Sequence, residues 1–156
     1  MKLRVIATGH RMPAWVQAGW HDYAGRLPRD FALELVELKP EARDRGRPIA
    51  RLLAAEGERV EREWAGDWVR IALDERGARW TTREFADRIA GWRDAGQAAA
   101  FAIGSADGLD ETVKRHASSM FSLSALTLPH GLVRVILAEQ IYRAVSLLSG
   151  HPYHRD

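Results

Sequence analysis

Short apolar runs alternate with longer amphipathic stretches along this chain of 156 residues, and this alternation constrains the fold more than any other feature. The first segments are an apolar run over 3–8, an amphipathic stretch over 13–25 and a second apolar run over 33–38. A strand-length run, a helical pattern and another such run are typical of a β-α-β unit. Because such units build parallel sheets that helices cover, the sequence predicts an α/β fold.

The same alternation continues through the middle of the chain. Hydrophobic residues at helical spacing over 48–64 predict a second helix, and the apolar run over 68–73 predicts a third strand that ends before a turn. Thr81 and Glu84 have the spacing of a capping box, which predicts a helix that begins there and ends at Gly96.

Two further apolar runs, over 98–103 and 123–128, are too short for helices and end at a glycine and a proline. Both are predicted to be buried parallel strands. The longest helix is expected over 130–149, before a polar tail at 151–156. Five strands alternating with helices predict a three-layer sandwich, with helices on both faces of the sheet.

Ligands of open parallel sheets bind at the carboxyl ends of the strands. In this chain, that rule selects the turns after Leu73, after Ile103 and around 123–129. We therefore expect a binding site where these three segments meet.

The predicted helix over 130–149 is apolar on two faces. Leu132, Val135 and Ile136 lie on one face, and Leu137 and Ile141 lie on another. A helix of this kind must be covered twice. The second cover is either another copy of the chain, which gives a homodimer through this helix, or further helices within a three-layer monomer.

The composition, with 46% hydrophobic and 28% charged residues, is that of a soluble globular protein, and the length predicts one domain over 1–156. The absence of cysteine excludes disulfides, thiol nucleophiles and cysteine zinc sites. No apolar run approaches the roughly 20 residues of a membrane helix, and no signal-peptide pattern precedes the first strand. We expect a cytoplasmic protein with no membrane partner.

The net charge of +2 does not by itself indicate a nucleic-acid partner. Twenty of the 23 basic residues are arginine, which either suits phosphate contacts and stacking on bases or reflects a GC-rich genome. From residue 125 onward there are three arginines, three histidines and only two acids. The C-terminal segment is therefore the one with a cationic character.

The turn over 104–108 lies directly after a predicted strand, and its glycines allow a ligand to approach the backbone closely. It lacks the three-glycine spacing of the dinucleotide fingerprint, which disfavours a nicotinamide enzyme. No phosphate loop, HExxH or GxSxG motif occurs in the sequence. His151 and His154 have a metal-like spacing but no third ligand nearby, so no metal site is expected.

Two C-terminal motifs are specific: Leu-Ser-Ala-Leu-Thr-Leu-Pro-His over 123–130, followed by Arg134-Val135, and His-Pro-Tyr-His-Arg over 151–155. Together with Met-Pro-x-Trp-Val-Gln over 12–17, Leu73-Asp74 and Ile103-Gly104, they make the whole chain resemble the RlmH-type methyltransferases of the SPOUT superfamily. One departure is Ser105. At this position many relatives have the second glycine of a Gly-Gly-x-x-Gly turn. If that glycine has a positive φ, Ser105 must tolerate it or the turn must shift.

The resemblance implies a SPOUT fold with a deep trefoil knot at the C-terminal side of the sheet. It also implies S-adenosylmethionine-dependent methylation of N3 of a pseudouridine in bacterial 23S ribosomal RNA, on assembled ribosomes and not on DNA. By similarity, the adenosine pocket is formed by residues of the three strand ends, namely Leu73, Gly104, Leu123, Ser124, Ala125, Leu126, Thr127 and Leu128.

The N3 atom of a pseudouridine carries a weakly acidic proton, so methylation needs positioning and a base or cation that favours the deprotonated imide. The candidate catalytic residues are His130, Arg134, Glu139, Arg143, His151, Tyr153, His154 and Arg155. We expect Arg155 to hold phosphate or the imide oxygens, Tyr153 to stack on or hydrogen-bond the base, and His151 or His154 to assist proton removal.

Other interpretations of these residues remain open. Glu139 and Arg143 have the spacing of an ordinary i, i+4 ion pair on a helix, and the tail is alternatively a frayed terminus. At the level of function, the alternative is a noncatalytic RNA-binding or ribosome-associated domain that has kept the knotted fold. Binding of S-adenosylmethionine distinguishes the two, because a pure binding module does not need the cofactor.

Overall fold

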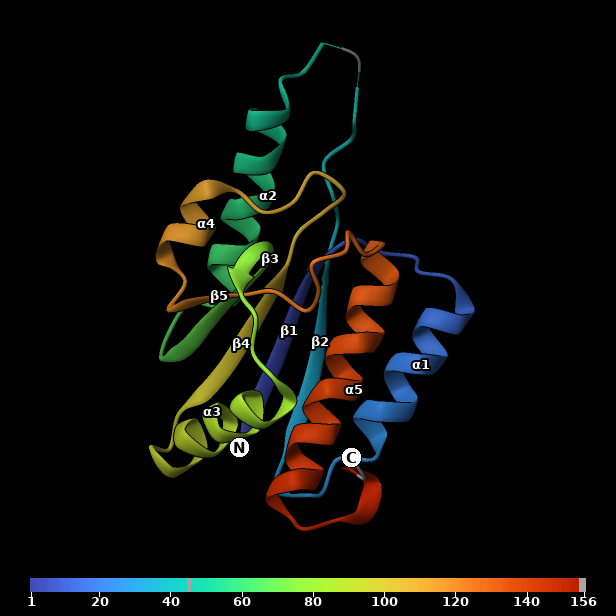
Figure 1. Cartoon of the computed structure of the whole chain (residues 1–156). Coiled ribbons are helices and arrows are strands. Elements are labelled where there is room, and N and C mark those ends of the chain that lie inside the picture. Colours follow the sequence, from blue (N-terminus) through green and yellow to red (C-terminus); the bar gives the residue numbers. More distant parts are fainter. Residues whose placement is uncertain (45, 155–156) are drawn as a thin grey trace.

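Five parallel strands form one sheet in the computed structural model of the chain, which describes residues 1–44 and 46–154 (Figure 1). The strands are β1 (Lys2–Thr8), β2 (Ala32–Leu38), β3 (Trp68–Ala78), β4 (Ala98–Ile103) and β5 (Ser119–Phe121). Their order across the sheet is β2-β1-β4-β3-β5, and each neighbouring pair is parallel. The predicted α/β class is confirmed.

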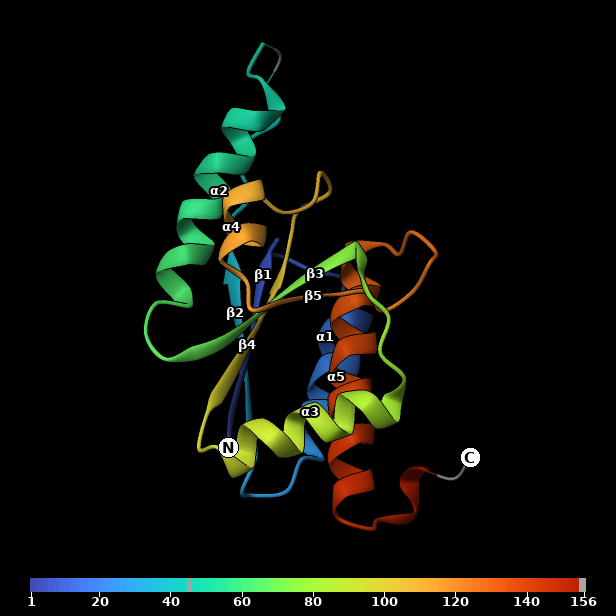
Figure 2. The same ribbon diagram turned by 60° about the vertical axis from the view of Figure 1, so that its left-hand side comes forward.

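Helices cover both faces of this sheet. They are α1 (Ala14–Gly25), α2 (Ile49–Glu63), α3 (Thr82–Asp94), α4 (Glu111–His116), α5 (His130–Leu148) and the one-turn 3-10 helix η1 (Pro152–His154). The two views show α1, α3 and α5 on one face and α2 with α4 on the other (Figures 1 and 2). The chain therefore folds into three layers, as the alternation of strands and helices predicts.

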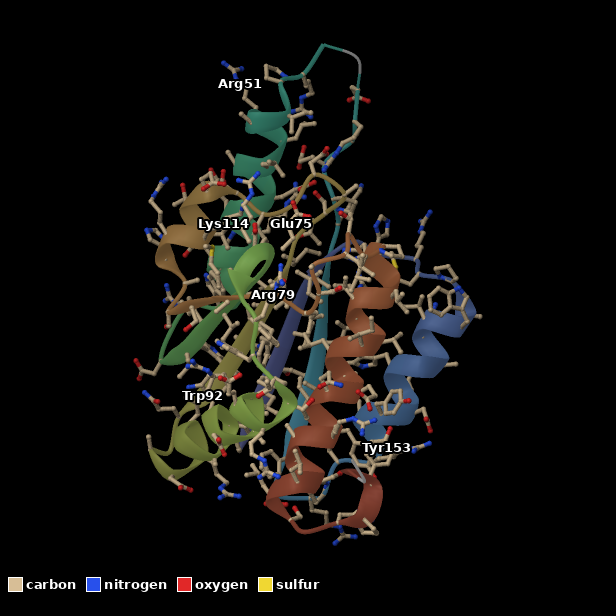
Figure 3. The ribbon with its side chains drawn as sticks, in the orientation of Figure 1. Arg51, Glu75, Arg79, Trp92, Lys114 and Tyr153 are labelled. Carbon is tan, nitrogen blue, oxygen red and sulfur yellow. The ribbon has the colours of Figure 1, made fainter. Side chains whose placement is uncertain are left out.

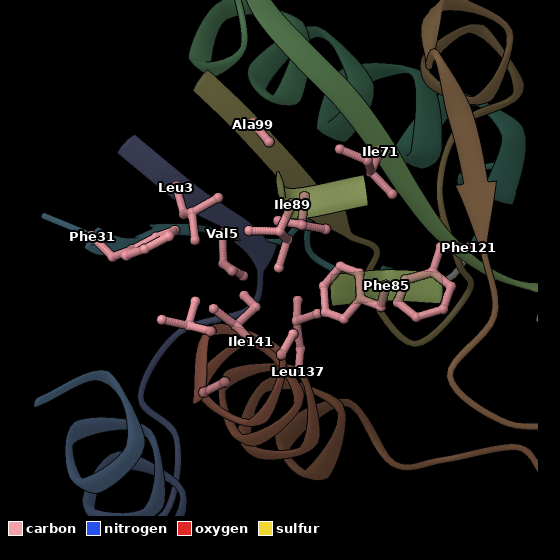
Figure 4. Packing of buried hydrophobic residues seen from close by; sticks show 14 of the residues in the cluster. Leu3, Val5, Phe31, Ile71, Phe85, Ile89, Ala99, Phe121, Leu137 and Ile141 are labelled. Atoms are coloured by element: carbon pink, nitrogen blue, oxygen red, sulfur yellow. The ribbon is translucent and has the colours of Figure 1, made fainter. Parts of the chain in front are cut away.

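Each face of the sheet has its own hydrophobic core. On one face, Leu137 and Ile141 of α5 lie opposite Val5 and Phe85 in the larger cluster of buried side chains (Figure 4). On the other face, helices α2 and α4 bury Val60, Trp64 and Val113 against the sheet. Burial on both faces explains why the run that forms β4 contains no polar residue.

Helix α3 begins at the predicted capping box. The Thr81 hydroxyl accepts a hydrogen bond from the Glu84 backbone N–H at 3.2 Å, and the Glu84 carboxylate accepts one from the Thr81 N–H at 2.7 Å. Two backbone donors at the helix start are thereby satisfied. The prediction from the spacing of these two residues is confirmed.

The predicted fifth strand over 123–128 is wrong in position. The structure places β5 at Ser119–Phe121, and 123–128 is an irregular loop. In this loop the Ser122 hydroxyl donates to the Ser124 carbonyl at 2.8 Å, and the Ser124 hydroxyl accepts from the Leu126 N–H at 2.9 Å. Such local hydrogen bonds compete with strand pairing.

Strand β3 is longer than predicted, since it continues to Ala78 and does not end at a turn after Leu73. Both Leu73 and Ala78 pair with Phe121, so residues 74–77 form an irregularity between them. A Cβ atom on Gly77 would lie 2.6 Å from the Phe121 backbone nitrogen. The absence of a side chain at Gly77 therefore allows the two strands to approach each other.

The two apolar faces of α5 are covered largely by its own chain. Helices α1 and α3 flank it, and a Cβ atom on Gly19 of α1 would lie 2.9 Å from the Val135 side chain. Leu132 and Ile136 remain half-buried. In-chain covering thus accounts for much of the apolar surface.

Among the described residues, no helix combines the length and the apolar character needed to cross a membrane.

Candidate active site

A cavity of about 700 Å³ lies at the carboxyl ends of β3, β4 and β5. Its walls come from residues 73–76, 103–111, 121–124 and 126–128, with Ala50 and Leu53 of α2, Lys114 of α4, and His130 and Val133 of α5. The strand-end rule selected the segments after 73 and 103 and around 123–129. A cavity of this size fits a small-molecule ligand or cofactor.

Most of the residues predicted to form the adenosine pocket line this cavity. Seven of the eight do so: Leu73, Gly104, Leu123, Ser124, Leu126, Thr127 and Leu128. Ala125 does not contribute to the wall. Leu126 is 72% exposed although it is a large aliphatic residue, so its side chain is available to a bound molecule at the cavity mouth.

The glycine turn is shaped by contacts within itself. A Cβ atom on Gly104 would lie 2.3 Å from the carbonyl group of Gly108, so a side chain there would displace the turn. The expectation that a ligand approaches the backbone at Gly104 stays a prediction: Gly104 lines the cavity, and a side chain there would meet Gly108. Positive φ falls on Gly108, at +89°, whereas Ser105 has a negative φ. Ser105 thus fits the turn without backbone strain.

An ion pair lies in the wall on the α4 side. Lys114 and Asp74 are 2.8 Å apart, and both side chains are largely buried. Burial opposes the charge on Asp74, but hydrogen bonds from Lys114 and the Arg76 backbone N–H outweigh it and lower the pKa of the carboxyl. The cavity therefore presents a fixed negative and a fixed positive charge beside its leucines.

His130 and Arg134 form a buried network at the amino end of α5. The His130 Nδ1–H donates to the Gly104 carbonyl at 2.8 Å, and His130 Nε2 accepts from Arg134 Nη2 at 2.8 Å. Arg134, only 1% exposed, also donates to the Gly9 carbonyl at 2.7 Å and to Glu37 at 2.5 Å. These bonds join the ends of β1, β2 and β4 to the start of α5.

Burial, and next the charge of Arg134, lower the pKa of His130 below its ordinary value. His130 is therefore neutral at pH 7, with Nδ1 as the donor and Nε2 as the acceptor. Both ring nitrogens of His130 are hydrogen-bonded to protein groups. The side chain therefore supports the cavity wall and is not a free base.

Glu139, Arg143 and Tyr153 form a second group further along α5. Arg143 Nη2 lies 2.6 Å from Glu139 Oε1, which is the i, i+4 pair allowed by their spacing. The Tyr153 hydroxyl donates to the same carboxylate at 3.2 Å, and its ring packs against Tyr142 in a tilted arrangement with centroids 4.6 Å apart. Burial raises the pKa of Tyr153 to about 12, so its hydroxyl is a neutral donor at pH 7.

The predicted catalytic residues therefore fall into two separate groups. Arg143 lies 13 positions beyond His130, which is about 20 Å along a helix axis. Figure 3 shows Tyr153 near one end of α5, and Glu75 of β3 and Lys114 of α4 toward the level of the other end. His151 is exposed in the tail. Arg155 and the side chain of His154 lie outside what the structure describes.

Several residues in or next to the cavity were not among the predicted site residues. Asp74 and Lys114 line it and pair across 40 positions of sequence. Glu56 on α2 does not line it, but this buried residue bonds to Ser105 of the glycine turn at 2.7 Å. Asp74 directly follows an apolar run, which is a usable signal. No local pattern marks Glu56 or Lys114. Within the described part of the chain, no cluster of three His, Asp or Glu side chains is suited to a metal ion.

Comparison with known proteins identifies the class to which this fold and cavity belong. A family model described as "Predicted SPOUT methyltransferase" matches residues 1–154. The chain belongs to the SPOUT methyltransferase family. Within that family, it is 52% identical over 155 residues to "Ribosomal RNA large subunit methyltransferase H" of Nitrosospira multiformis, with 99% of both chains covered. It is 51% identical over 156 residues, and all of both chains, to the protein of the same name from Thiobacillus denitrificans. The RlmH-type resemblance is confirmed.

A solved structure of a protein from Bacillus anthracis has a similar fold. It aligns with 97% of this chain and 96% of its own, with a TM-score of 0.55 and 13% sequence identity. At this identity the likeness concerns the fold alone. The trefoil knot that the resemblance implies stays a prediction.

Proposed function

We propose that the chain transfers a methyl group from S-adenosylmethionine to N3 of a pseudouridine in 23S ribosomal RNA of assembled bacterial ribosomes, in the cytoplasm. The observation that carries this function is the cavity at the carboxyl ends of β3, β4 and β5, where the segments of the RlmH-type motif meet. The full-length relatives named as ribosomal RNA large subunit methyltransferases support the substrate class.

The lining of the cavity suits S-adenosylmethionine. Leu73, Leu123 and Leu128 offer apolar contacts for an adenine ring, and the loop backbones offer hydrogen bonds. The acidic residues Asp74 and Glu75 suit the cationic sulfonium and amino groups of the cofactor, and Lys114 suits its carboxylate. When bound, S-adenosylmethionine supplies an electrophilic methyl group, and the protein must bring the base to it.

The groups suited to acting on the base lie away from the cavity in the same chain. The Tyr153 hydroxyl and the Arg143 guanidinium lie at the far end of α5, with the tail docked against them. We propose that these residues and Arg155 complete the cavity of a second subunit. Arg155 holds phosphate or the imide oxygens, Tyr153 contacts the base, and His151 or His154 assists proton removal.

This arrangement requires a homodimer through α5, for which the half-buried Leu132 and Ile136 provide apolar surface. Ile136→Asp places a charge in that surface and should produce monomers in sedimentation at micromolar concentration. Leu137 is fully buried in the core of its own chain, so Leu137→Asp would report on folding instead. Ile49→Asp, at an exposed position on α2, is the matched control and should stay dimeric. If the unaltered chain sediments as a monomer, the proposed dimer is wrong.

The experiment that tests the function is transfer of labelled methyl from S-adenosylmethionine to assembled ribosomes and, in parallel, to free 23S RNA. We expect incorporation at one pseudouridine in ribosomes and much less in free RNA. Binding to ribosomes without cofactor binding or methyl transfer would favour the noncatalytic RNA-binding alternative. Incorporation at another base would leave the methyltransferase class intact and overturn the assigned target.

A further inference from the structure

A buried carboxylate contacts the glycine turn without itself lining the cavity. Glu56 of α2 is 3% exposed, and its two oxygens are surrounded by donors. Oε1 accepts from Arg43 Nη1 at 2.5 Å and from the Glu41 backbone N–H at 2.8 Å, and Oε2 accepts from the Ser105 hydroxyl at 2.7 Å. The carboxylate thus joins helix α2, the segment after β2 and the turn over 104–108.

Arg43 makes the same connection from a second direction. Its Nη2 donates to the Ser105 hydroxyl at 2.7 Å, and its Nε donates to Asp107 at 2.9 Å. One guanidinium therefore holds two side chains of the glycine turn while it neutralises Glu56. A planar guanidinium can hold several acceptors in one fixed geometry, which an ammonium group cannot do as well.

The charge of Glu56 is stabilised within this cluster. Burial disfavours the ionised form of Glu56, but hydrogen bonds from Arg43, Ser105 and the Glu41 N–H outweigh it and lower the pKa of the carboxyl. A buried charge with this many partners is costly to disturb, because the loss of one partner leaves the others unsatisfied. The cluster is therefore a rigid support for the segment to which it is bound.

The supported segment is the cavity wall itself. Every residue from Gly104 to Asp110 lines the cavity, so a shift of the turn changes the shape of the wall. We propose that Arg43, Glu56 and Ser105 are positioning residues, which set the affinity for S-adenosylmethionine by fixing the turn over 104–108. This inference rests on the proposed function. None of the three needs to touch the methyl group or the base.

The direct test is Glu56→Gln, measured by calorimetry with S-adenosylmethionine and by steady-state methyl transfer. Either orientation of the amide puts an NH₂ group against donors of Arg43, Glu41 or Ser105, so the turn loses part of its support. We expect the cofactor affinity to fall about tenfold, while kcat at saturating cofactor stays within about twofold. Glu58→Gln, at an exposed position of the same helix, is the matched control and should bind like the unaltered chain.

A second variant keeps the test decisive if Glu56→Gln fails to fold. Ser105→Ala removes the hydroxyl of the half-buried Ser105 and should weaken cofactor binding by a smaller factor in the same direction. The double variant Ser105→Ala with Arg43→Gln should weaken binding by less than the product of the two single effects, because both act through one turn. Unchanged cofactor affinity in Ser105→Ala and in folded Glu56→Gln would overturn the inference.

Amide hydrogen exchange separates this inference from the proposed function. The positioning role predicts faster exchange of the amides in 104–110 in Glu56→Gln than in Glu58→Gln, with no cofactor present. If the unaltered chain bound no S-adenosylmethionine, the proposed function would fail, and the exchange result would show whether Glu56 still fixes the turn. Equal exchange in the two variants would refute the positioning role.

Discussion

The two ends of α5 carry the same kinds of polar residue in opposite settings. At the amino end, Arg134 is almost fully buried, and its donors are shared among His130, Gly9 and Glu37. At the carboxyl side, Arg143 is about one-third exposed and has Glu139 as its ion-pair partner. The first arginine joins elements around the cavity, whereas the second remains accessible to another molecule. Burial, more than residue type, distinguishes the settings of the two arginines.

The largest effect expected from this comparison is on catalysis by the carboxyl end. Deletion of residues 152–156 should reduce methyl transfer to ribosomes at least about 1000-fold, or about 4 kcal/mol in activation free energy. Cofactor affinity and dimerisation should change less than about twofold, because the tail is proposed to contact the base, and neither Pro152 nor Tyr153 lines the cavity. Calorimetry and sedimentation provide the controls. Retention of a tenth of the activity would contradict a catalytic role of the tail.

The two arginines can be compared directly by replacing each with methionine. Arg134→Met should lower the free energy of unfolding by about 3 kcal/mol, since the buried Gly9 carbonyl, the partly buried His130 ring and the carboxylate of Glu37 all lose their donor. Arg143→Met removes a partly exposed pair and should cost less than about 1 kcal/mol. Urea unfolding measures both. Equal losses would mean that burial does not distinguish the two ends.

The cavity end should be sensitive to the shape of the glycine turn. Gly104→Val places a branched side chain against the Gly108 backbone, so the turn must move and cofactor affinity should fall about 100-fold. Circular dichroism should still show a folded chain. Gly91→Val is the control, because a Cβ atom on Gly91 of α3 meets nothing within 4 Å. Unchanged affinity in Gly104→Val would place the cofactor elsewhere.

The smallest effect concerns the protonation of His130. Its pKa is lowered in the folded chain, first by burial, so below about pH 6.5 the unfolded chain binds more protons than the folded one. The stability that neutral His130 contributes is fully present above that pH and is lost as the pH falls further, by at most about 1.4 kcal/mol per pH unit. His130→Gln should flatten urea-unfolding stability between pH 7 and pH 5.5. His21→Gln, at an exposed position of α1, should leave the slope unchanged.

Periodicity and caps were sufficient to predict most of the fold. Apolar runs marked β1, β2 and β4, and Thr81 with Glu84 marked the start of α3. The run over 123–128 misled because its leucines line a cavity and Leu126 reaches solvent, which gives the same sequence pattern as a buried strand. A pattern of apolar residues does not reveal whether protein or a ligand covers them.

The site could be predicted only where it follows strand ends. The cavity lies beside Leu73 and after Ile103, where strand order directs attention, although β3 continues to Ala78 and has no turn after Leu73. The support of the turn by Glu56 and Arg43 joins residues up to 64 positions apart, and the buried role of Arg134 depends on contacts with Gly9 and Glu37. Such long-range hydrogen bonds leave no spacing signal in the sequence.

The central claim, that the cavity of one subunit works with the tail of the other, is tested most directly by mixing two inactive variants. One subunit lacks residues 152–156 and keeps its cavity, and the other carries Gly104→Val and keeps its tail. A heterodimer then has one intact cavity facing one intact tail, and it should recover up to half of the unaltered methyl-transfer activity. Separable affinity tags show whether heterodimers form. Heterodimers that form and remain inactive would contradict the shared site, and the tail would then act on the cavity of its own chain.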